Sequence, residues 1–388
     1  MKEKLPDIKL NFNGKTNYKV LIAPLDWGLG HTTRIIPIIH QFLSAGCQVI
    51  LAGNSKQRSL LMAEFPTLDF LHLPGYNVKY SQHHRFFVWK LLLQLPSLQS
   101  IIRKEQRWLN KIINEYKIDL VISDNRYGLF NKKIHTVFIT HQLRIRSPFG
   151  KMIDKAIQKL HYQLIEKFDE CWVPDQLENG LGGELSHPEI KPNIPVSYTG
   201  WLSRFKQDLE IKKEKYLLII FSGPEPQRTI FEDIVLEEIN TIHMPVILVR
   251  GLPGEKKIPE LAPGIIVYNH LPSVELNRLM LEASFIISRC GYSTVMDVAR
   301  LKKRSILVPT PGQTEQEYLT GFLSSKHLVY CEKQSSFSLT KCLEQAKQFE
   351  YYFPTENADQ LAILIAATIN KLDLKIPAEN TYLQKTSI

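Results

Sequence analysis

Short runs of β-branched and aromatic residues alternate with longer amphipathic stretches from Tyr18 onward. Such alternation is typical of a parallel sheet covered by helices, since each crossover between parallel strands needs a helix-sized connection. The runs are short and bounded by turn residues, as buried strands are. In the first half of the chain we expect strands at Tyr18–Ala23, Gln48–Ala52, Asp69–His72, Asp119–Ser123, Thr136–Thr140 and Cys171–Val173.

A second series of runs predicts a second α/β unit, as 388 residues also exceed what one hydrophobic core organises. Its strands are expected at Tyr216–Ser222, Pro245–Arg250, Ile265–Tyr268, Ser284–Ser288, Ser305–Pro309 and Leu328–Tyr330. Prolines, glycines and then lysines replace the periodic pattern near Thr199–Lys215, which marks the domain junction. We predict an N-terminal extension (1–17), a first domain (18–200), a linker (201–215), a second domain (216–350), and a C-terminal helix and tail (351–388) that either completes the second domain or crosses back onto the first.

Composition indicates the redox state of the cysteines, the cellular location and the kind of partner. The five cysteines are an odd number without a CxxC pair, which predicts reduced thiols. The polar N-terminus lacks a signal-peptide core, and no apolar run reaches the ~18 residues of a membrane span, so we expect a cytoplasmic protein. A net charge of +9 favours an anionic partner, either substrate phosphates or an anionic lipid surface. Nucleic acid is not expected, because no known binding module accompanies the charge.

The segment DWGLGHTTR follows the first predicted strand and precedes an apolar-periodic helix. Gly28 and Gly30 allow close approach of backbone to a ligand, and the start of a helix offers unpaired N–H groups to an anion. His31 at this turn has the chemistry of a general base. The alternative interpretation is a tight turn whose helix is capped by Thr32 or Thr33.

A longer motif, SRCGYSTVMDVARLKKRSILVPTPGQTEQEYL, lies in the second domain. A strand leads through Arg289 and Gly291 into a helix that carries Ser293, Thr294 and Asp297. Hydroxyls and free N–H groups at a helix start suit a diphosphate, and a carboxylate one turn later suits ribose hydroxyls.

The segment PGQTEQE begins the next predicted helix. Gln313, Glu315 and Gln316 carry amides and a carboxylate, which hydrogen-bond sugar hydroxyls. A capping box of Thr314 with Glu317 and a solvated polar face would explain the same residues.

A third turn, FSGPEPQRT, contains Ser222 and Gly223 at a strand end and Arg228 near a helix start. Arg228 would point toward an anion, although the segment taken alone also fits a plain strand-to-helix turn.

These motifs together resemble glycosyltransferase family 28 and its MurG-like members, most clearly over Tyr18–Gly46 and Asn269–Phe322. The resemblance implies a GT-B fold, which has two Rossmann-like domains facing a cleft. It also implies inverting transfer from a UDP-sugar, with no required metal and no cofactor. By position, the family's donor-side residues fall on Gly28, Gly30, His270, Leu271, Gly291, Ser293, Thr294, Asp297, Glu315 and Gln316. The family's GGS-type loop is replaced here by FSGPEPQRT, whose Ser222 and Gly223 we also expect at the donor site.

Such a reaction needs a base on the acceptor side and charge stabilisation at the leaving diphosphate. We predict His31 as the base, oriented by Asp26. The helix start at Gly291, with Arg289 or Arg228 nearby, is expected to neutralise the diphosphate. No DxD pair that would hold a metal is present in the sequence.

Residues 83–116 mix Phe, Trp and Leu with Arg and Lys. This composition is typical of an interfacial helix on anionic lipid, and equally of core-packed helices with cationic outer faces. A lipid-linked acceptor would place the protein peripherally on the inner face of the cell membrane.

Three functions stay open from sequence. The first is transfer of a hexose or N-acetylhexosamine from a UDP-sugar to a lipid-linked or cell-envelope glycan. The second is hydrolysis of the UDP-sugar, in which water replaces the acceptor. The third is a GT-B scaffold that binds nucleotide or glycan without turnover.

Overall fold

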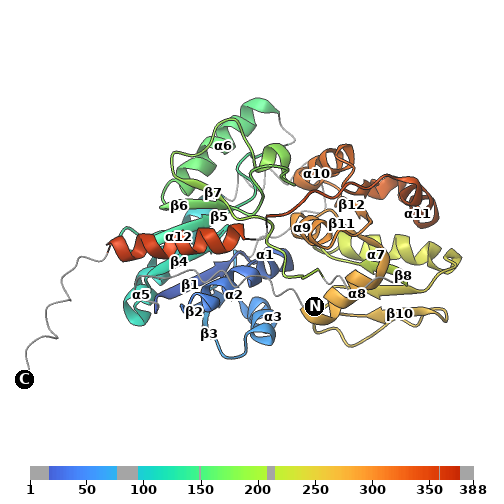
Figure 1. Cartoon of the computed structure of the whole chain (residues 1–388), viewed down its shortest axis with the longest axis horizontal. Helices are drawn as coiled ribbons and strands as arrows, with labels where there is room; N and C mark the ends of the chain where they lie inside the picture. The colour runs from blue at the N-terminus through green and yellow to red at the C-terminus, as the bar shows by residue number, and fades with distance from the viewer. Residues whose placement is uncertain (1–16, 77–94, 148–149, 208–214, 358, 376–388) are drawn as a thin grey trace, which may run out of the picture.

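A computed structural model of the chain describes residues 17–76, 95–147, 150–207, 215–357 and 359–375. It shows two α/β domains, each built on a parallel sheet with helices on its faces (Figure 1). Within the described residues the first sheet has the order β3-β2-β1-β4-β5-β6-β7 and the second the order β10-β9-β8-β11-β12-β13. This is the GT-B fold that the sequence predicts.

The first domain forms where the sequence places its β-rich runs. Its strands are β1 Lys19–Pro24, β2 Gln48–Gly53, β3 Asp69–His72, β4 Leu120–Asp124, β5 His135–Ile139, β6 Glu170–Val173 and β7 Val196–Tyr198. Its helices are α1 Leu29–Arg34, α2 Ile36–Ser44, α3 Ser55–Glu64, α5 Leu95–Tyr116 and α6 Lys151–Ile165. The sequence analysis missed β7, which has three residues and follows a proline-rich segment.

The second domain repeats the arrangement. Its strands are β8 Tyr216–Ile220, β9 Val246–Val249, β10 Ile265–Tyr268, β11 Ala283–Arg289, β12 Ser305–Val308 and β13 Tyr330–Cys331. Its helices are α7 Gln227–Glu238, α8 Ser273–Glu282, α9 Tyr292–Leu301, α10 Thr314–Ser325 and α11 Leu339–Gln348.

The strand orders fix where a ligand can enter. In each sheet the order in which strands are added reverses next to the first strand, between β1 and β4 and between β8 and β11. At such switch points the loops separate above the carboxyl ends of the strands and leave a crevice. Pro24 pairs with Asp124 at the carboxyl ends of β1 and β4, so the loops that follow these strands meet there.

The last helix, α12 Gln360–Lys375, crosses back onto the first domain (Figure 1). Lys371 donates to Glu170 at 2.6 Å, and the Tyr18 hydroxyl donates to Asp373. Buried Ile365 and Ile369 add apolar packing. The helix therefore belongs to the first domain in space, although it follows the second in sequence.

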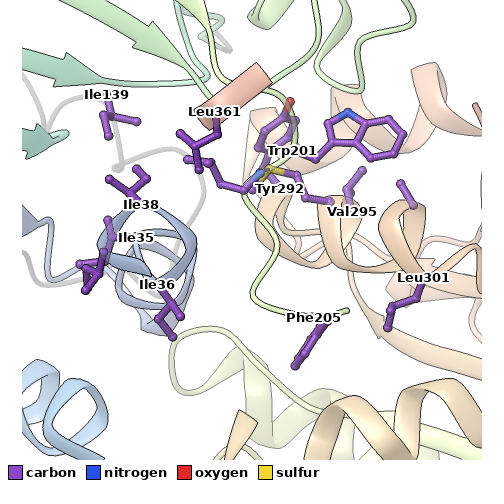
Figure 2. Packing of buried hydrophobic residues seen from close by; sticks show 14 of the residues in the cluster. Ile35, Ile36, Ile38, Ile139, Trp201, Phe205, Tyr292, Val295, Leu301 and Leu361 are labelled. Carbon is purple, nitrogen blue, oxygen red and sulfur yellow. Dashed lines mark hydrogen bonds between the residues drawn. The ribbon is translucent and has the colours of Figure 1, made fainter. Parts of the chain in front are cut away.

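Buried apolar side chains also join the two domains. Figure 2 shows Ile35 and Ile38 of the first domain near Trp201 of the connecting segment and Tyr292 and Val295 of α9, all within one cluster. This cluster packs the start of α9 against the helices that follow β1. Apolar burial of this kind stabilises the closed arrangement of the two domains.

The two interpretations of the basic aromatic stretch 83–116 can be compared with the structure only in its second part, because 83–94 lie outside the described residues. In α5, Leu109, Ile112 and Ile113 are buried against the first sheet, and Ile102 is buried as well. For 98–116 the core-packed alternative therefore holds. Within the described ranges, no helix combines the length and apolarity that a membrane span requires.

Candidate active site between the two domains

His31 lies on α1, directly after the turn that leaves β1. Gly28 begins the helix with φ of 73°, a left-handed conformation that glycine adopts without strain. No side chain caps this helix, and the Thr33 hydroxyl bonds back to the carbonyl of Gly30 instead. The capping interpretation of Thr32 and Thr33 is therefore wrong.

Asp124 at the end of β4 contacts the imidazole of His31. The distances from His31 Nδ1 to the two carboxylate oxygens are 3.1 and 3.2 Å. Asp124 is fully buried, and Arg34 donates to it through both Nε, at 2.9 Å, and Nη2. Burial alone would raise the pKa of Asp124, but Arg34 and His31 outweigh it and hold the pKa at about 2.

The ionised carboxylate determines the tautomer of His31. Because Asp124 only accepts hydrogen bonds, Nδ1 of His31 carries the proton and Nε2 keeps its lone pair. Burial first, and then the charge of Arg34, lower the pKa of His31 below its ordinary value. His31 is therefore neutral at pH 7 and has the protonation state that a general base needs.

The structure corrects the expected partner of His31. Asp26 accepts hydrogen bonds from the backbone N–H of Tyr76 at 3.0 Å and from Asn54 at 3.5 Å, and the orienting carboxylate belongs to Asp124. The sequence analysis ended the strand at Ser123, one residue short of this group.

The donor-side helix start lies against the His31 loop. Ser293 Oγ donates to the carbonyl of Gly30 at 3.1 Å. A Cβ atom added to Gly30 would lie 3.0 Å from Ser293 Oγ. Gly291 begins α9 without a side-chain cap, so the first N–H groups of this helix stay available to an anion. Thr294 lies in the same first turn. The two motifs that the sequence singled out are thus brought together.

Asp297, one turn into α9, faces the connecting segment. Its carboxylate accepts from Ser203 Oγ at 2.6 Å, and burial, partly offset by Arg204, raises its pKa to about 6. Arg204 also lowers the pKa of His270, after burial. Sequence reasoning missed Arg204, whose Nε has no hydrogen-bond partner among the described residues. Leu271, next to His270, is buried.

Arg228 does not point toward an anion site. It is buried and paired with Glu225 at 2.5 Å and with Glu232 at 2.7 Å, so its charge is already neutralised. Spacing of four residues between Arg228 and Glu232 was a signal for this pair in the sequence. Ser222 and Gly223 form the turn before it, where Gly223 has φ of 100°.

Arg289 lies beneath the crevice and is 2% exposed. It donates to the carbonyls of Pro309 and Gln227, at 3.2 and 2.5 Å, and its guanidinium lies 4.4 Å from the ring centroid of Phe231. Burial lowers the pKa of Arg289 to about 10, so it stays protonated at pH 7. Arg289 therefore contributes positive potential from below, without access to a bound ligand.

The loop before α10 is braced by its own side chains. Gln316 accepts from the backbone N–H of Thr310 at 2.7 Å and donates to Gln313 at 2.5 Å. Glu315 instead reaches the first domain, where His141 and Gln142 contact it. The capping box, which was the alternative interpretation, is not formed in this described segment: Thr314 donates to the carbonyl of Arg146, and Glu317 accepts from the backbone N–H of Gly312.

Comparison with known proteins agrees with this arrangement. The model of the glycosyltransferase family 28 C-terminal domain matches residues 255–364, which include α9 and α10. The chain is a glycosyltransferase similar to those of family 28. An uncharacterised glycosyltransferase of Methanosarcina acetivorans is 21% identical to this chain over 327 residues, covering 77% of it and 81% of the relative.

Two further proteins are similar to this chain, one in part of its sequence and one in its fold. A Clostridium perfringens UDP-N-acetylglucosamine transferase, named for its pyrophosphoryl-undecaprenol acceptor, is 28% identical over 135 residues, covering 33% of this chain and 35% of the relative. UGT89C1 of Arabidopsis thaliana, solved with UDP-L-rhamnose, superposes with a TM-score of 0.58 at 13% identity, covering 93% and 94% of the two chains. At that identity the superposition shows the fold.

Proposed function

We propose that the protein transfers a hexose or N-acetylhexosamine from a UDP-sugar to a hydroxyl of a lipid-linked or cell-envelope glycan, with inversion and without a metal. The observation that carries the proposal is the His31–Asp124 pair at the switch point of the first sheet, with the start of α9 bonded to the same loop. A base and an anion-binding helix start are the two functions that such a transfer requires.

The proposed reaction is a single displacement. The acceptor hydroxyl oxygen attacks the anomeric carbon, and its proton moves to Nε2 of His31. The bond from the anomeric carbon to the diphosphate oxygen breaks, and UDP leaves with the electron pair. Because attack and departure occur on opposite faces, the anomeric configuration inverts. Asp124 then stabilises the imidazolium, as a buried carboxylate does in a hydrogen-bonded acid–base pair.

The donor is proposed to lie along the second domain. Free N–H groups at Gly291 and the hydroxyls of Ser293 and Thr294 would bind the diphosphate, helped by the positive potential of Arg289. Asp297 would accept hydrogen bonds from the ribose hydroxyls. Among the described residues no three His, Cys, Asp or Glu side chains form a cluster that suits a metal.

A ligand-binding measurement tests the donor site. A ligand at ~100 times its dissociation constant stabilises a protein by about 2.7 kcal/mol, so UDP should raise the melting temperature. We expect this shift with UDP, a smaller one with GDP, ADP, dTDP or CMP, and its loss in Asp297→Ala. No shift with any nucleotide would contradict the donor site. A UDP shift retained in Asp297→Ala would contradict the role of Asp297 alone.

We further propose a membrane contact through α6, on the cytoplasmic face of the membrane. Met152 is 87% exposed and Leu160 38% exposed, two turns apart on the same side of the helix. Lys151, Lys155 and Lys159 are exposed around them. Exposed apolar side chains flanked by lysines fit an anionic lipid surface, where each basic residue contributes ~1 kcal/mol.

Vesicle sedimentation tests this contact. Wild type should bind vesicles containing phosphatidylglycerol more strongly than neutral phosphatidylcholine vesicles, and the combined Met152→Glu and Leu160→Glu substitutions should reduce that binding. Val274→Glu is the matched control, because Val274 is 78% exposed on α8 of the other domain. Equal binding of the α6 variant and wild type would exclude α6 as the contact.

A further inference from the structure

Glu315 makes a buried contact between the domains that the donor site does not explain. It lies in the first turn of α10, in the second domain. Its Oε1 accepts from Nε2 of His141 at 2.7 Å, and its Oε2 accepts from Nε2 of Gln142 at 2.5 Å. His141 and Gln142 follow β5 of the first domain. Both oxygens of the carboxylate are therefore used to hold the domains together.

Arg34 connects this contact to the proposed base. Its Nη1 lies 3.2 Å from Nδ1 of His141, while its Nε and Nη2 donate to Asp124. A guanidinium has only donors, so Nδ1 of His141 must accept. The remaining ring proton of His141 is then on Nε2 and points to Glu315. Hydrogen bonds thus run in one direction, from Arg34 to His141 and from His141 to Glu315.

The connecting residues have little freedom to move. Arg34 is 2% exposed and His141 6% exposed, and the imidazole of His141 stacks on Tyr292 of α9 with ring centroids 4.2 Å apart and planes 6° from parallel. Burial alone would raise the pKa of Glu315, but His141, His31 and Arg34 keep it below its ordinary value. Glu315 is therefore ionised at pH 7, which strengthens its bond from His141.

We infer that Glu315 is a positioning residue that orients the His31–Asp124 pair when the domains close. This inference rests on the proposed function, in which His31 is the base. In the closed arrangement Glu315 fixes the position of His141 by a hydrogen bond. His141 in turn fixes the guanidinium of Arg34 in the orientation in which Arg34 donates to Asp124. When the domains separate, His141 loses this acceptor and Arg34 loses the restraint. Activation of the acceptor is thereby coupled to closure of the cleft, which also excludes water.

The variant Glu315→Gln tests the inference through steady-state kinetics and UDP binding. We expect kcat to fall about 10- to 100-fold, because small displacements of catalytic groups have effects of that size. The affinity for UDP should stay unchanged. The acid limb of the pH–rate profile should move to lower pH, since removal of a nearby negative charge lowers the pKa of His31. Glu317→Gln is the control, because it removes the same charge from the same helix and the Glu317 carboxylate accepts from the backbone N–H of Gly312 in its own domain.

Four outcomes separate this inference from its alternatives. Glu315→Gln with normal kcat and weakened UDP-sugar binding would make Glu315 a sugar ligand and overturn the inference. Additive effects of His141→Phe and Glu315→Gln would also overturn it, because residues that act through one another are non-additive. Full activity of His31→Ala would instead remove the proposed base, whereas an inactive His31→Ala beside a normal Glu315→Gln would remove only the positioning role.

Discussion

His31→Ala should lower kcat for sugar transfer by about 10²- to 10⁴-fold, the range that a positioned general base contributes. The substitution removes Nε2, the proposed acceptor of the proton of the attacking hydroxyl. Binding of UDP should persist, because the donor residues lie on the second domain. The measurement is the initial rate of UDP release with an acceptor present.

The pH dependence of the wild-type rate follows from the same residue. The pKa of His31 is lowered, so the base is deprotonated at pH 7 and gains nothing from a further rise in pH. The rate should stay level around neutrality and fall in acid, at a pH below the ordinary histidine value of ~6.5. His40→Ala is the matched control, because His40 is exposed on the next helix. A rate for His31→Ala within a few-fold of wild type would reject His31 as the base.

Asp124→Asn should have two effects, one on activity and one on stability. An amide at this position can donate to Nδ1 of His31 and so favour the tautomer whose Nε2 is protonated. A loss of kcat up to ~10⁴-fold is expected from that change. The substitution also leaves Arg34 buried without its carboxylate, and breaking a buried pair costs about 3–5 kcal/mol. Kinetics and thermal unfolding measure the two effects separately.

The sign of the pH effect on stability follows from the pKa of Asp124. Because the folded-state pKa of about 2 lies below the ordinary value of 3.8, the carboxylate stabilises the fold above pH 4 and loses this contribution as pH falls toward 2. The stability of the Asp124→Asn variant should lack this acid-dependent contribution. Asp119→Asn, at the other end of the same strand, is the control and should keep both activity and acid dependence. An Asp124→Asn protein with wild-type kcat and stability would contradict the assigned pair.

The fold was largely predictable from sequence because parallel strands buried on both faces consist of continuous apolar runs. KVLIAP and ASFIISR are examples, and both became central strands. β7 escaped notice since VSY is only three residues long and has a partly exposed pattern. The backbone pairing with β6, and not the local sequence, makes it a strand.

The loops of the active site could be predicted from sequence, but the contacts between side chains distant in sequence could not. His31 and the α9 motif follow strands and carry local signals. Asp124 lies 93 positions from His31 in sequence and reaches it only because β1 and β4 are neighbours in the sheet. Glu315 was assigned to the donor sugar because spacing along one chain gives no information on contacts between domains.

Acceptor dependence of UDP release tests the central claim most directly. Wild-type protein is incubated with a UDP-sugar panel, with and without a lipid extract that supplies glycan acceptors, and UDP is measured over time. We expect release that requires the extract, together with a new glycosylated lipid. Release at the same rate in water alone would identify a hydrolase and contradict the transfer that we propose.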